Sequence, residues 1–172
     1  MKKIDPFDLK IQPCEDWEHK WYLLTAGDFA SGKYNTMTVG WGTTGIMWGR
    51  PVVQVVVRPQ RYTFGFMNEY DSFTLTAFPK EYKKALGILG TKSGRDGDKI
   101  TESGLTAVAS QIVAAPTFAE AELSIECKKL YWQDMDPAKF VDLAIDNVYE
   151  GKDYHRFFIG EMVHIMGTEE YC

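Results

Sequence analysis

The sequence has 172 residues, 45% of them hydrophobic and 25% charged, which excludes a fibrous or disordered chain and is typical of one globular domain over residues 1–172. The formal charge of −5 argues against a general nucleic-acid binder, because such a protein needs a basic face to displace counterions from phosphates. Three widely spaced cysteines without a CxxC pair exclude a disulfide scaffold and a zinc ribbon, and favour a reducing compartment.

The first fifteen or so residues, which include Pro6 and Pro13, predict an extended lead-in. Acidic residues and Pro6 stand where a signal peptide would have its apolar core, and no stretch is apolar enough to span a membrane. We therefore expect a cytoplasmic protein. Strands are expected at Trp21 to Ala26 and at Tyr34 to Val39, of which the second is rich in threonine.

Strands and short helices are expected to follow one another through the middle of the chain. Pro51 to Arg58 is rich in valine, which indicates a strand buried on both faces. Thr63 to Tyr70 changes to a helical period, with Thr63 as a natural N-cap. Ser72 to Phe78 alternates as a strand does, and Glu81 to Leu89 has a helical composition.

The second half is expected to begin with a loop, Gly90 to Asp98, which is rich in glycine and charge. A short helix from Asp98 to Ser103, closed by a left-handed Gly104, follows it. The remaining expected elements are strands at Leu105 to Val113 and Ala121 to Trp132, a helix from Asp136 to Val148 with Asp136 as N-cap, and a strand from Tyr154 to Ile165. Because the strands come in consecutive groups, a mainly β, antiparallel barrel or sandwich is favoured over a doubly wound parallel sheet.

Two nucleotide-binding motifs are matched only in part. Gly40 to Gly45 reads GxGxxG after a strand, but the segment from Ile46 to Pro51 cannot form the helix that a dinucleotide fingerprint needs. Gly90 to Ser93 lacks the glycines of a P-loop. The three histidines have no ligand spacing between them and no paired-cysteine partner, so no metal site is expected.

Three segments share a chemistry suited to a phosphorylated planar ligand. Asn35 to Gly42 is a strand with alternating hydroxyls, followed by glycines that permit close approach and a tryptophan that can lie on a ring. Arg58 to Thr63 places two guanidiniums and a hydroxyl at a strand end and a helix start, where an anion is favoured. Lys92 to Asp96 is a loop with two cations and a hydroxyl. Each segment alone also fits surface charge, a solvated turn or aromatic core; their combination favours a ligand site.

These segments resemble the flavin reductase-like, FMN-binding split-barrel family, and within it the flavoredoxin-type branch. The resemblance runs through nearly the whole chain, in the motifs NTMTVGWG from Asn35, RPQRYT from Arg58, KSGRD from Lys92, CKKLY from Cys127 and DYHRFFIGE from Asp153. It implies a six-stranded antiparallel split β-barrel that forms a homodimer and binds FMN at or near the subunit interface. Such a pocket would use part of the aromatic content of 14%.

The resemblance also implies roles for individual residues. Four residues would follow the polar edge of the flavin ring, with Trp41 beside it: Asn35, Thr36, Met37 and Thr38. The FMN phosphate would be held by Arg58, Arg61 and Thr63, with Ser93 and Arg95 closing over it. The Lys92 ammonium would stabilise the anionic reduced flavin at its N1/O2 edge and raise its potential. His155 would lie beside the flavin.

The activity that the resemblance implies is the transfer of a hydride from NAD(P)H to the flavin, followed by transfer of electrons to an unidentified acceptor. A nicotinamide can stack on an exposed flavin face, so the failed dinucleotide fingerprint does not oppose this activity. An electron-transfer flavoprotein with bound FMN and no direct NAD(P)H activity is the alternative. A flavin-free barrel that binds another planar ligand is a third hypothesis.

Overall fold

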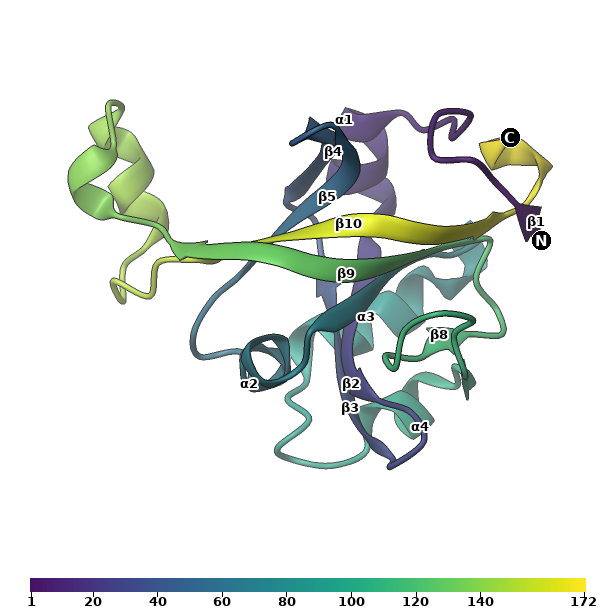
Figure 1. Cartoon of the computed structure of the whole chain (residues 1–172). Helices are drawn as coiled ribbons and strands as arrows, with labels where there is room; N and C mark the ends of the chain where they lie inside the picture. Colours follow the sequence, from purple (N-terminus) through teal and green to yellow (C-terminus); the bar gives the residue numbers. More distant parts are fainter.

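Seven strands pair in one antiparallel path, β3-β2-β6-β9-β10-β5-β4, and the short β1 pairs with β10 beside it (Figure 1). The computed structural model describes residues 1–172. The strands of this sheet are β1 (Lys2–Lys3), β2 (Tyr22–Asp28), β3 (Lys33–Val39), β4 (Gly42–Met47), β5 (Arg50–Val57), β6 (Ser72–Ala77), β9 (Leu123–Asp134) and β10 (Arg156–Gly167). The expected mainly β, antiparallel architecture is confirmed. The sheet has eight strands against the six expected, because it includes β1 and β4, for which the sequence predicts no strand.

Short helices cover the faces of the sheet, with α2 packed on β2 and β3, and α3 on β3. The helices are α1 (Pro13–Glu15), the π-helical turn η1 (Asp16–Lys20), α2 (Tyr62–Glu69), η2 (Lys80–Tyr82), α3 (Lys83–Thr91), α4 (Lys99–Ser103), and the 3-10 turns η3 (Pro137–Lys139), η4 (Leu143–Val148) and η5 (Glu169–Tyr171). A separate two-stranded sheet consists of β7 (Ala107–Val108) and β8 (Thr117–Phe118). No helix is both long and apolar enough to cross a membrane.

Alternation along β2 divides the apolar residues between two cores. Leu24 faces the main core inside the sheet, where it packs in one cluster with Val55 and Phe73. Leu23 belongs to the opposite face, in a second cluster with Leu86 of α3. Since successive strand residues point to opposite faces, β2 fixes α3 against the outer face of the sheet while its other face fills the interior.

The two ends of the strand path, β3 and β4, are consecutive in the chain but do not pair with each other. Gly40 and Trp41 connect them. β3 therefore has a ladder with β2 along one edge only, and its other edge keeps backbone N–H and C=O groups that no neighbouring strand satisfies. We call this opening of the sheet the seam.

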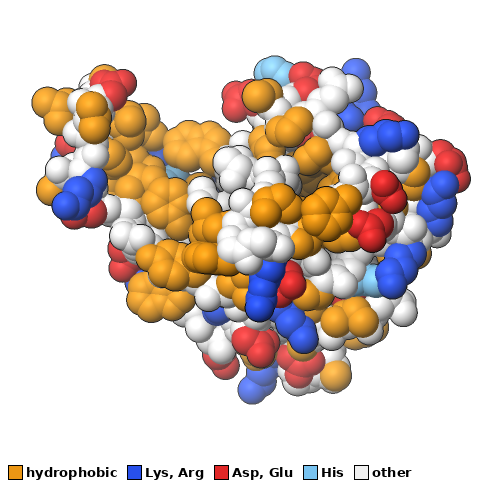
Figure 2. All heavy atoms as spheres, turned by 45° about the horizontal axis from the view of Figure 1, so that its top comes forward, with side chains coloured by type: hydrophobic (Ala, Val, Ile, Leu, Met, Phe, Trp, Pro, Cys, Tyr) orange, Lys and Arg blue, Asp and Glu red, His pale blue; other side chains and the backbone are white.

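Beyond the end of β6, β9 and β10 continue as an arm in which β10 also pairs with β5, and the arm ends in a lobe, residues 135–155, at the left of Figure 1. Apolar side chains of the lobe are exposed, with Val141 99% and Leu143 77% exposed. Figure 2 shows hydrophobic side chains on the lobe and on the adjoining body. Two tryptophans are exposed as well, Trp132 of β9 at 50% and Trp48 of the β4–β5 turn at 61%, and Trp48 lies 6.2 Å from Tyr131 of β9 between ring centres.

The segment that reads GxGxxG, residues 40–45, runs from the connection after β3 into the strand β4. It forms a hairpin with β5 through the two-residue turn Trp48-Gly49. Both turn residues have positive φ, 54° and 71°, which is the backbone conformation that a tight hairpin turn requires. No helix follows the glycines, as the sequence predicts. The expected extended lead-in is wrong in part, because α1 and η1 are helical and η1 buries Trp17.

The expected strand from Leu105 to Val113 is wrong except for Ala107–Val108. The buried carboxylate of Glu126 accepts the backbone N–H groups of the three residues 111–113 at 2.7–3.1 Å. Amides that a carboxylate holds are not available to a neighbouring strand, so this apolar segment becomes an ordered loop.

The expected helix from Asp136 to Val148 is wrong as one continuous helix. Asp136 does act as an N-cap and accepts from the Ala138 N–H at 2.9 Å, but only a single 3-10 turn follows. Asp142 begins a second 3-10 turn by accepting from the Ala144 N–H at 2.9 Å. The lobe lies away from the body, so no core is available to hold a longer amphipathic helix by packing.

Candidate functional site

A cleft of about 410 Å³ lies at the seam, where the end of β3, the end of β5 and the beginning of β10 meet. We call it the seam cleft. Its lining residues are Met37, Thr38, Val39, Gly40, Trp41, Val56, Arg58, Gln60, Arg61 and His155. Residues that are distant in the sequence but belong to the predicted site therefore meet here, in a volume that suits a small-molecule ligand.

The side of β3 at the cleft offers backbone groups rather than free threonine hydroxyls. Thr36 is fully buried, and its Oγ1 donates to the Leu24 carbonyl oxygen at 3.2 Å. Thr38 lines the cleft, but its Oγ1 donates to the Leu86 carbonyl oxygen at 2.5 Å. Both hydroxyls therefore fix β3 to β2 and α3. The unpaired edge of β3 remains as the source of donors and acceptors for a ligand.

Asn35 and Thr63 connect β3 to α2. The Asn35 Nδ2 donates to Thr63 Oγ1 at 2.7 Å, and both residues are buried. The expected N-cap role of Thr63 is wrong, because α2 begins at Tyr62 with Arg61 in the capping position and without a side-chain cap. Neither Asn35 nor Thr63 lines the seam cleft. The Thr63 hydroxyl accepts from Asn35 and keeps its own O–H to donate, so its contact with a phosphate stays a prediction.

The arginines of the chain fall into two groups, those that form an ion pair with a carboxylate and those that do not. Three of them form ion pairs with carboxylates: Arg50, Arg58 and Arg156. Arg61 donates only to the Gly90 carbonyl oxygen and Arg95 only to the Gln60 carbonyl oxygen, both at 3.1 Å. In a chain with net charge −5, two neighbouring guanidiniums without a carboxylate are a ready place for an anion.

Arg58 also lines the cleft, but its charge is matched. Its Nη1 lies 3.1 Å from Asp153 Oδ2, and its Nη2 donates to the Val148 carbonyl oxygen at 3.1 Å. The guanidinium carbon lies 5.1 Å from the centre of the Tyr149 ring. Because these three partners belong to the lobe, Arg58 fixes the lobe to the end of β5.

The loop after α3 places its three predicted site residues in different surroundings. The Lys92 Nζ forms an ion pair with Glu102 and does not line the seam cleft. Ser93 Oγ accepts the backbone N–H of Arg95 at 3.2 Å. Arg95 alone reaches the cleft segment, through Gln60. The role of Lys92 at the flavin stays a prediction, which requires its ammonium to leave Glu102.

His155 lies at the cleft just before β10 and is 8% exposed. Its ring centre is 5.2 Å from that of Trp41, and its Nδ1 is 2.8 Å from the Tyr149 hydroxyl. Burial, together with the nearby Arg58 charge, lowers the pKa of His155 to about 4, so the imidazole is neutral at pH 7. We assign the Tyr149 hydroxyl as the donor to Nδ1, because an imidazole nitrogen accepts more strongly than the Met135 sulfur 3.4 Å away. Nε2–H then has no protein partner.

The sequence prediction omits Val56, Gln60 and Tyr149, which belong to this site or support it. Gln60 lies between the two arginines of the RPQR segment, and the RPQR motif therefore indicates Gln60 as a site residue too. Val56 is one of several valines in β5, and nothing distinguishes it in the sequence. Tyr149 reaches His155 only because the lobe folds back on itself.

The seam cleft combines a tryptophan wall, an unpaired backbone edge and the unmatched Arg61, and a second unmatched cation, Arg95, is bonded to Gln60 in its lining. These features fit a planar ring that carries a phosphate. The family described as "Flavin reductase like domain" matches residues 18–171. The chain belongs to this flavin reductase-like family. The resemblance inferred from the separated motifs is thereby confirmed, and membership assigns the chain a flavin-binding redox function.

Solved structures share the flavin reductase-like fold. Flavoredoxin from Methanosarcina acetivorans is 25% identical with a TM-score of 0.66, covering 89% of this chain and 70% of that chain. Flavoredoxin of Desulfovibrio vulgaris (Miyazaki F) is 24% identical with a TM-score of 0.67, covering 87% and 69%. An NADH:FAD oxidoreductase of Streptomyces globisporus C-1027 is 18% identical with a TM-score of 0.66, covering 89% and 78%. Among sequence relatives, an uncharacterized protein of Pyrococcus abyssi is 28% identical over 151 residues, 87% of this chain and 74% of its own.

Proposed function

We propose that the chain holds FMN in the seam cleft and passes electrons from NAD(P)H through the flavin to an acceptor. The observation that carries the proposal is the convergence of Trp41, the open edge of β3 and the unmatched Arg61 at one seam, with Arg95 bonded to the adjoining Gln60. Family membership and the likeness to flavoredoxin support it.

Each part of the site has a task in this proposal. The unpaired backbone groups of β3 would bond the polar edge of the ring, and Trp41 would lie beside it. Arg61 and Arg95 would hold the phosphate by charge-assisted hydrogen bonds. The Nε2–H of His155, oriented by Tyr149, would donate to an oxygen of the ring. When bound, FMN supplies the acceptance of hydride and the release of electrons, and the protein supplies position and electrostatics.

We further propose that a second copy of the chain covers the lobe. Val141 and Leu143 of the lobe are 99% and 77% exposed, and Trp48, beside Tyr131 of β9, is exposed as well. An apolar surface of this kind is typical of an interaction site. Because Arg58 ties the lobe to the seam cleft, the interface and the flavin would lie close together.

Rapid mixing tests the function directly. The purified chain is loaded with FMN, and the flavin absorption band is followed after mixing with NADH or with NADPH under anaerobic conditions. We expect one of the two nicotinamides to bleach the band. A chain that takes up no FMN would contradict both flavin hypotheses and favour a different planar ligand.

The electron-transfer alternative is favoured by one observation, the 25% identity to a flavoredoxin. In that case neither nicotinamide would bleach the bound flavin, whereas a reduced redox protein added in the same experiment would. The two hypotheses therefore give opposite results with the same loaded protein.

The two unmatched arginines allow a sharper test of the phosphate position. We expect Arg61→Ala and Arg95→Ala each to weaken FMN by about 10- to 100-fold, the effect of losing a charge-assisted hydrogen bond, and to leave riboflavin within about twofold. Arg50→Ala is the matched control, since Arg50 is paired with Glu161 and does not line the cleft. Fluorescence titration of both flavins gives the two dissociation constants. Equal losses for FMN and riboflavin would place the phosphate elsewhere.

A further inference from the structure

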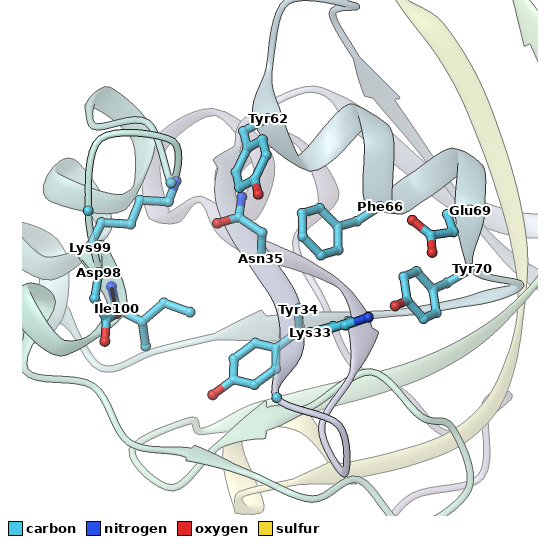
Figure 3. A pocket seen from close by; sticks show the side chains of 13 residues that line it. Lys33, Tyr34, Asn35, Tyr62, Phe66, Glu69, Tyr70, Asp98, Lys99 and Ile100 are labelled. Atoms are coloured by element: carbon cyan, nitrogen blue, oxygen red, sulfur yellow. Dashed lines mark hydrogen bonds between the residues drawn. The ribbon is translucent and has the colours of Figure 1, made fainter.

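A second cavity, of about 590 Å³, lies where α2, the beginning of β3 and the segment around α4 meet (Figure 3). We call it the aromatic cavity. It shares no lining residue with the seam cleft, and the function proposed above does not use it. The side chains that matter for its chemistry are Tyr34, Tyr62, Phe66, Tyr70 and Lys99.

One wall of the aromatic cavity is a ladder of rings spaced four residues apart at α2. Tyr62 and Phe66 meet edge to face at 5.3 Å between ring centres, and Phe66 and Tyr70 are stacked at 6.2 Å with 11° between their planes. Figure 3 shows these rings following one another along the helix, with Tyr34 across the cavity. Since aromatic rings pack well against other rings, this wall favours a planar aromatic ligand.

The end of the cavity at α4 holds a buried cation. Lys99 is 6% exposed, and a lysine is seldom buried unless its charge is paired. Its ammonium donates to the carbonyl oxygens of Leu89 at 2.9 Å and of Lys92 at 3.1 Å, and these two neutral partners leave one N–H over. Burial is the main cause that lowers the pKa of Lys99 to about 8, so the group is mostly charged at pH 7.

No carboxylate of the chain neutralises this ammonium. Asp98 accepts two backbone N–H groups at the start of α4, and Glu102 forms an ion pair with Lys92. Arg61 adds positive charge nearby, which lowers the pKa of Lys99 further. An anion bound in the cavity would therefore relieve the cost of the buried charge.

The opposite end of the cavity offers a weaker place for an anion. Figure 3 shows Lys33 and Glu69 at the Tyr70 end of the rings, away from Lys99. Both are exposed, so water solvates the Lys33 charge, and the carboxylate of Glu69 repels an anion there. The charges of the cavity thus favour a single carboxylate at the Lys99 end, with a ring along the wall of α2.

We propose that the aromatic cavity binds a small aromatic carboxylate, whose ring lies against Phe66 and whose carboxylate accepts from the Lys99 ammonium. The inference goes beyond the proposed function and does not depend on it. The ligand uses neither Arg61 nor Arg95 as a partner, so it and FMN can be bound at the same time.

A ligand series on the purified wild-type chain tests the site without any variant. Benzamide has the shape of benzoate without its charge, and cyclohexanecarboxylate has the charge without the planar ring. By isothermal titration calorimetry we expect benzoate to bind about tenfold more tightly than benzamide and about threefold more tightly than cyclohexanecarboxylate. Benzamide that binds as tightly as benzoate, or no saturable binding of benzoate up to about 10 mM, would overturn the inference.

Two variants assign the contacts. Lys99→Met should weaken benzoate by about 10- to 100-fold and leave benzamide within about twofold. Phe66→Ala, which acts from α2 should the first variant disturb α4, should weaken both ligands by about threefold to tenfold. Lys83→Met is the matched control, because Lys83 also donates to two backbone carbonyl oxygens, those of His19 and Lys20, but does not line the cavity. Benzoate affinity that neither cavity variant changes would contradict the proposal.

The pH dependence gives a readout that a merely structural lysine would not move. As Lys99 loses its proton, the benzoate affinity of the wild type should fall about tenfold from pH 7 to pH 9, whereas that of Lys99→Met should stay constant. A wild-type affinity that is constant over this range would remove Lys99 from the site.

Loading with FMN separates this inference from the proposed function. Saturating FMN should leave the dissociation constant of benzoate unchanged, whereas competition between the two would assign the cavity to the flavin and overturn the inference. A chain that binds benzoate in this manner but takes up no FMN would refute the proposed function and leave the carboxylate site in place.

Discussion

His155 illustrates how its surroundings set the chemistry of one residue. Its ring contacts those of Trp41 and Tyr149, it is 8% exposed, and the charge with the largest effect on it is the Arg58 cation. Burial and that cation both oppose protonation, which gives a pKa of about 4 in the folded chain against 6.5 for an ordinary histidine. The site therefore keeps a neutral imidazole with a free Nε2–H across the physiological pH range.

This shift predicts a pH dependence of stability. Above pH 6.5 the imidazole is neutral in both states, but between pH 6.5 and 4 the unfolded chain binds a proton that the folded chain does not. The free energy of unfolding should therefore fall as the pH drops through this window, by about 3 kcal/mol at most. Urea denaturation of the wild type and of His155→Gln at pH 7 and pH 4.5 measures it. The difference in stability between the two proteins should shrink at pH 4.5, and a constant difference would refute the assignment.

At the scale of elements, the packing of β10 beside β9 and against Phe73 of β6 depends on a residue without a side chain. A Cβ at Gly160 would come within 2.6 Å of the Phe73 ring and 2.9 Å of Cys127 Cβ. The β9–β10 register shifts between Ile159 and Gly160, so the close approach coincides with an irregularity in the ladder. The side chains of Phe73 and Cys127 fill the space that a side chain at position 160 would occupy.

We predict that Gly160→Ala lowers the free energy of unfolding by about 1–3 kcal/mol, the usual effect of forcing a methyl group into a packed core. Gly45→Ala in β4 is the matched control, because a Cβ at Gly45 meets nothing within 4 Å. Urea denaturation of both variants beside the wild type gives the comparison. A Gly160→Ala variant as stable as Gly45→Ala would show that the neighbouring side chains move aside.

Local sequence patterns predict the elements whose conformation depends on neighbouring residues in the chain. The valines of β5, the Asp98 cap and the left-handed Gly104 that closes α4 all lie where the sequence indicates. β4 has too few apolar residues to read as a strand and exists because the Trp48-Gly49 turn returns the chain along β5.

Local sequence patterns do not predict the elements whose conformation depends on residues distant in the sequence. The loop conformation of residues 111–113 depends on hydrogen bonds to the Glu126 carboxylate, which is distant in the sequence. The candidate site divides in the same way: motifs indicate Arg61 and Arg95, but only the folded chain reveals that their charges are unmatched whereas Asp153 neutralises Arg58.

At the scale of the whole molecule, the arm is the feature that a lone chain does not explain. Beyond Lys128, β9 has no strand along its outer edge, and the lobe at its end exposes Val141 and Leu143 to solvent. Such an arm gains stability when its apolar side chains are covered. A second copy of the chain is the partner that the proposed homodimer provides.

We predict that the double variant Val141→Asp, Leu143→Asp converts the protein to a monomer and weakens FMN, because the lobe borders the seam cleft through Arg58. Light scattering coupled to gel filtration gives the mass, and flavin fluorescence gives the affinity. Phe7→Asp, which changes a 77% exposed side chain outside the lobe, should leave both unchanged. A wild-type chain that is already monomeric would refute the proposed dimer.

The unpaired edge of β3 has a consequence for the behaviour of the protein without its ligand. An open strand edge is a template on which another chain can add a strand, and β3 has no neighbour beyond the seam to prevent it. A ligand bonded along this edge would protect it. We therefore expect the ligand-free protein to aggregate during storage more readily than the loaded protein, and its solubility to depend on the supply of flavin.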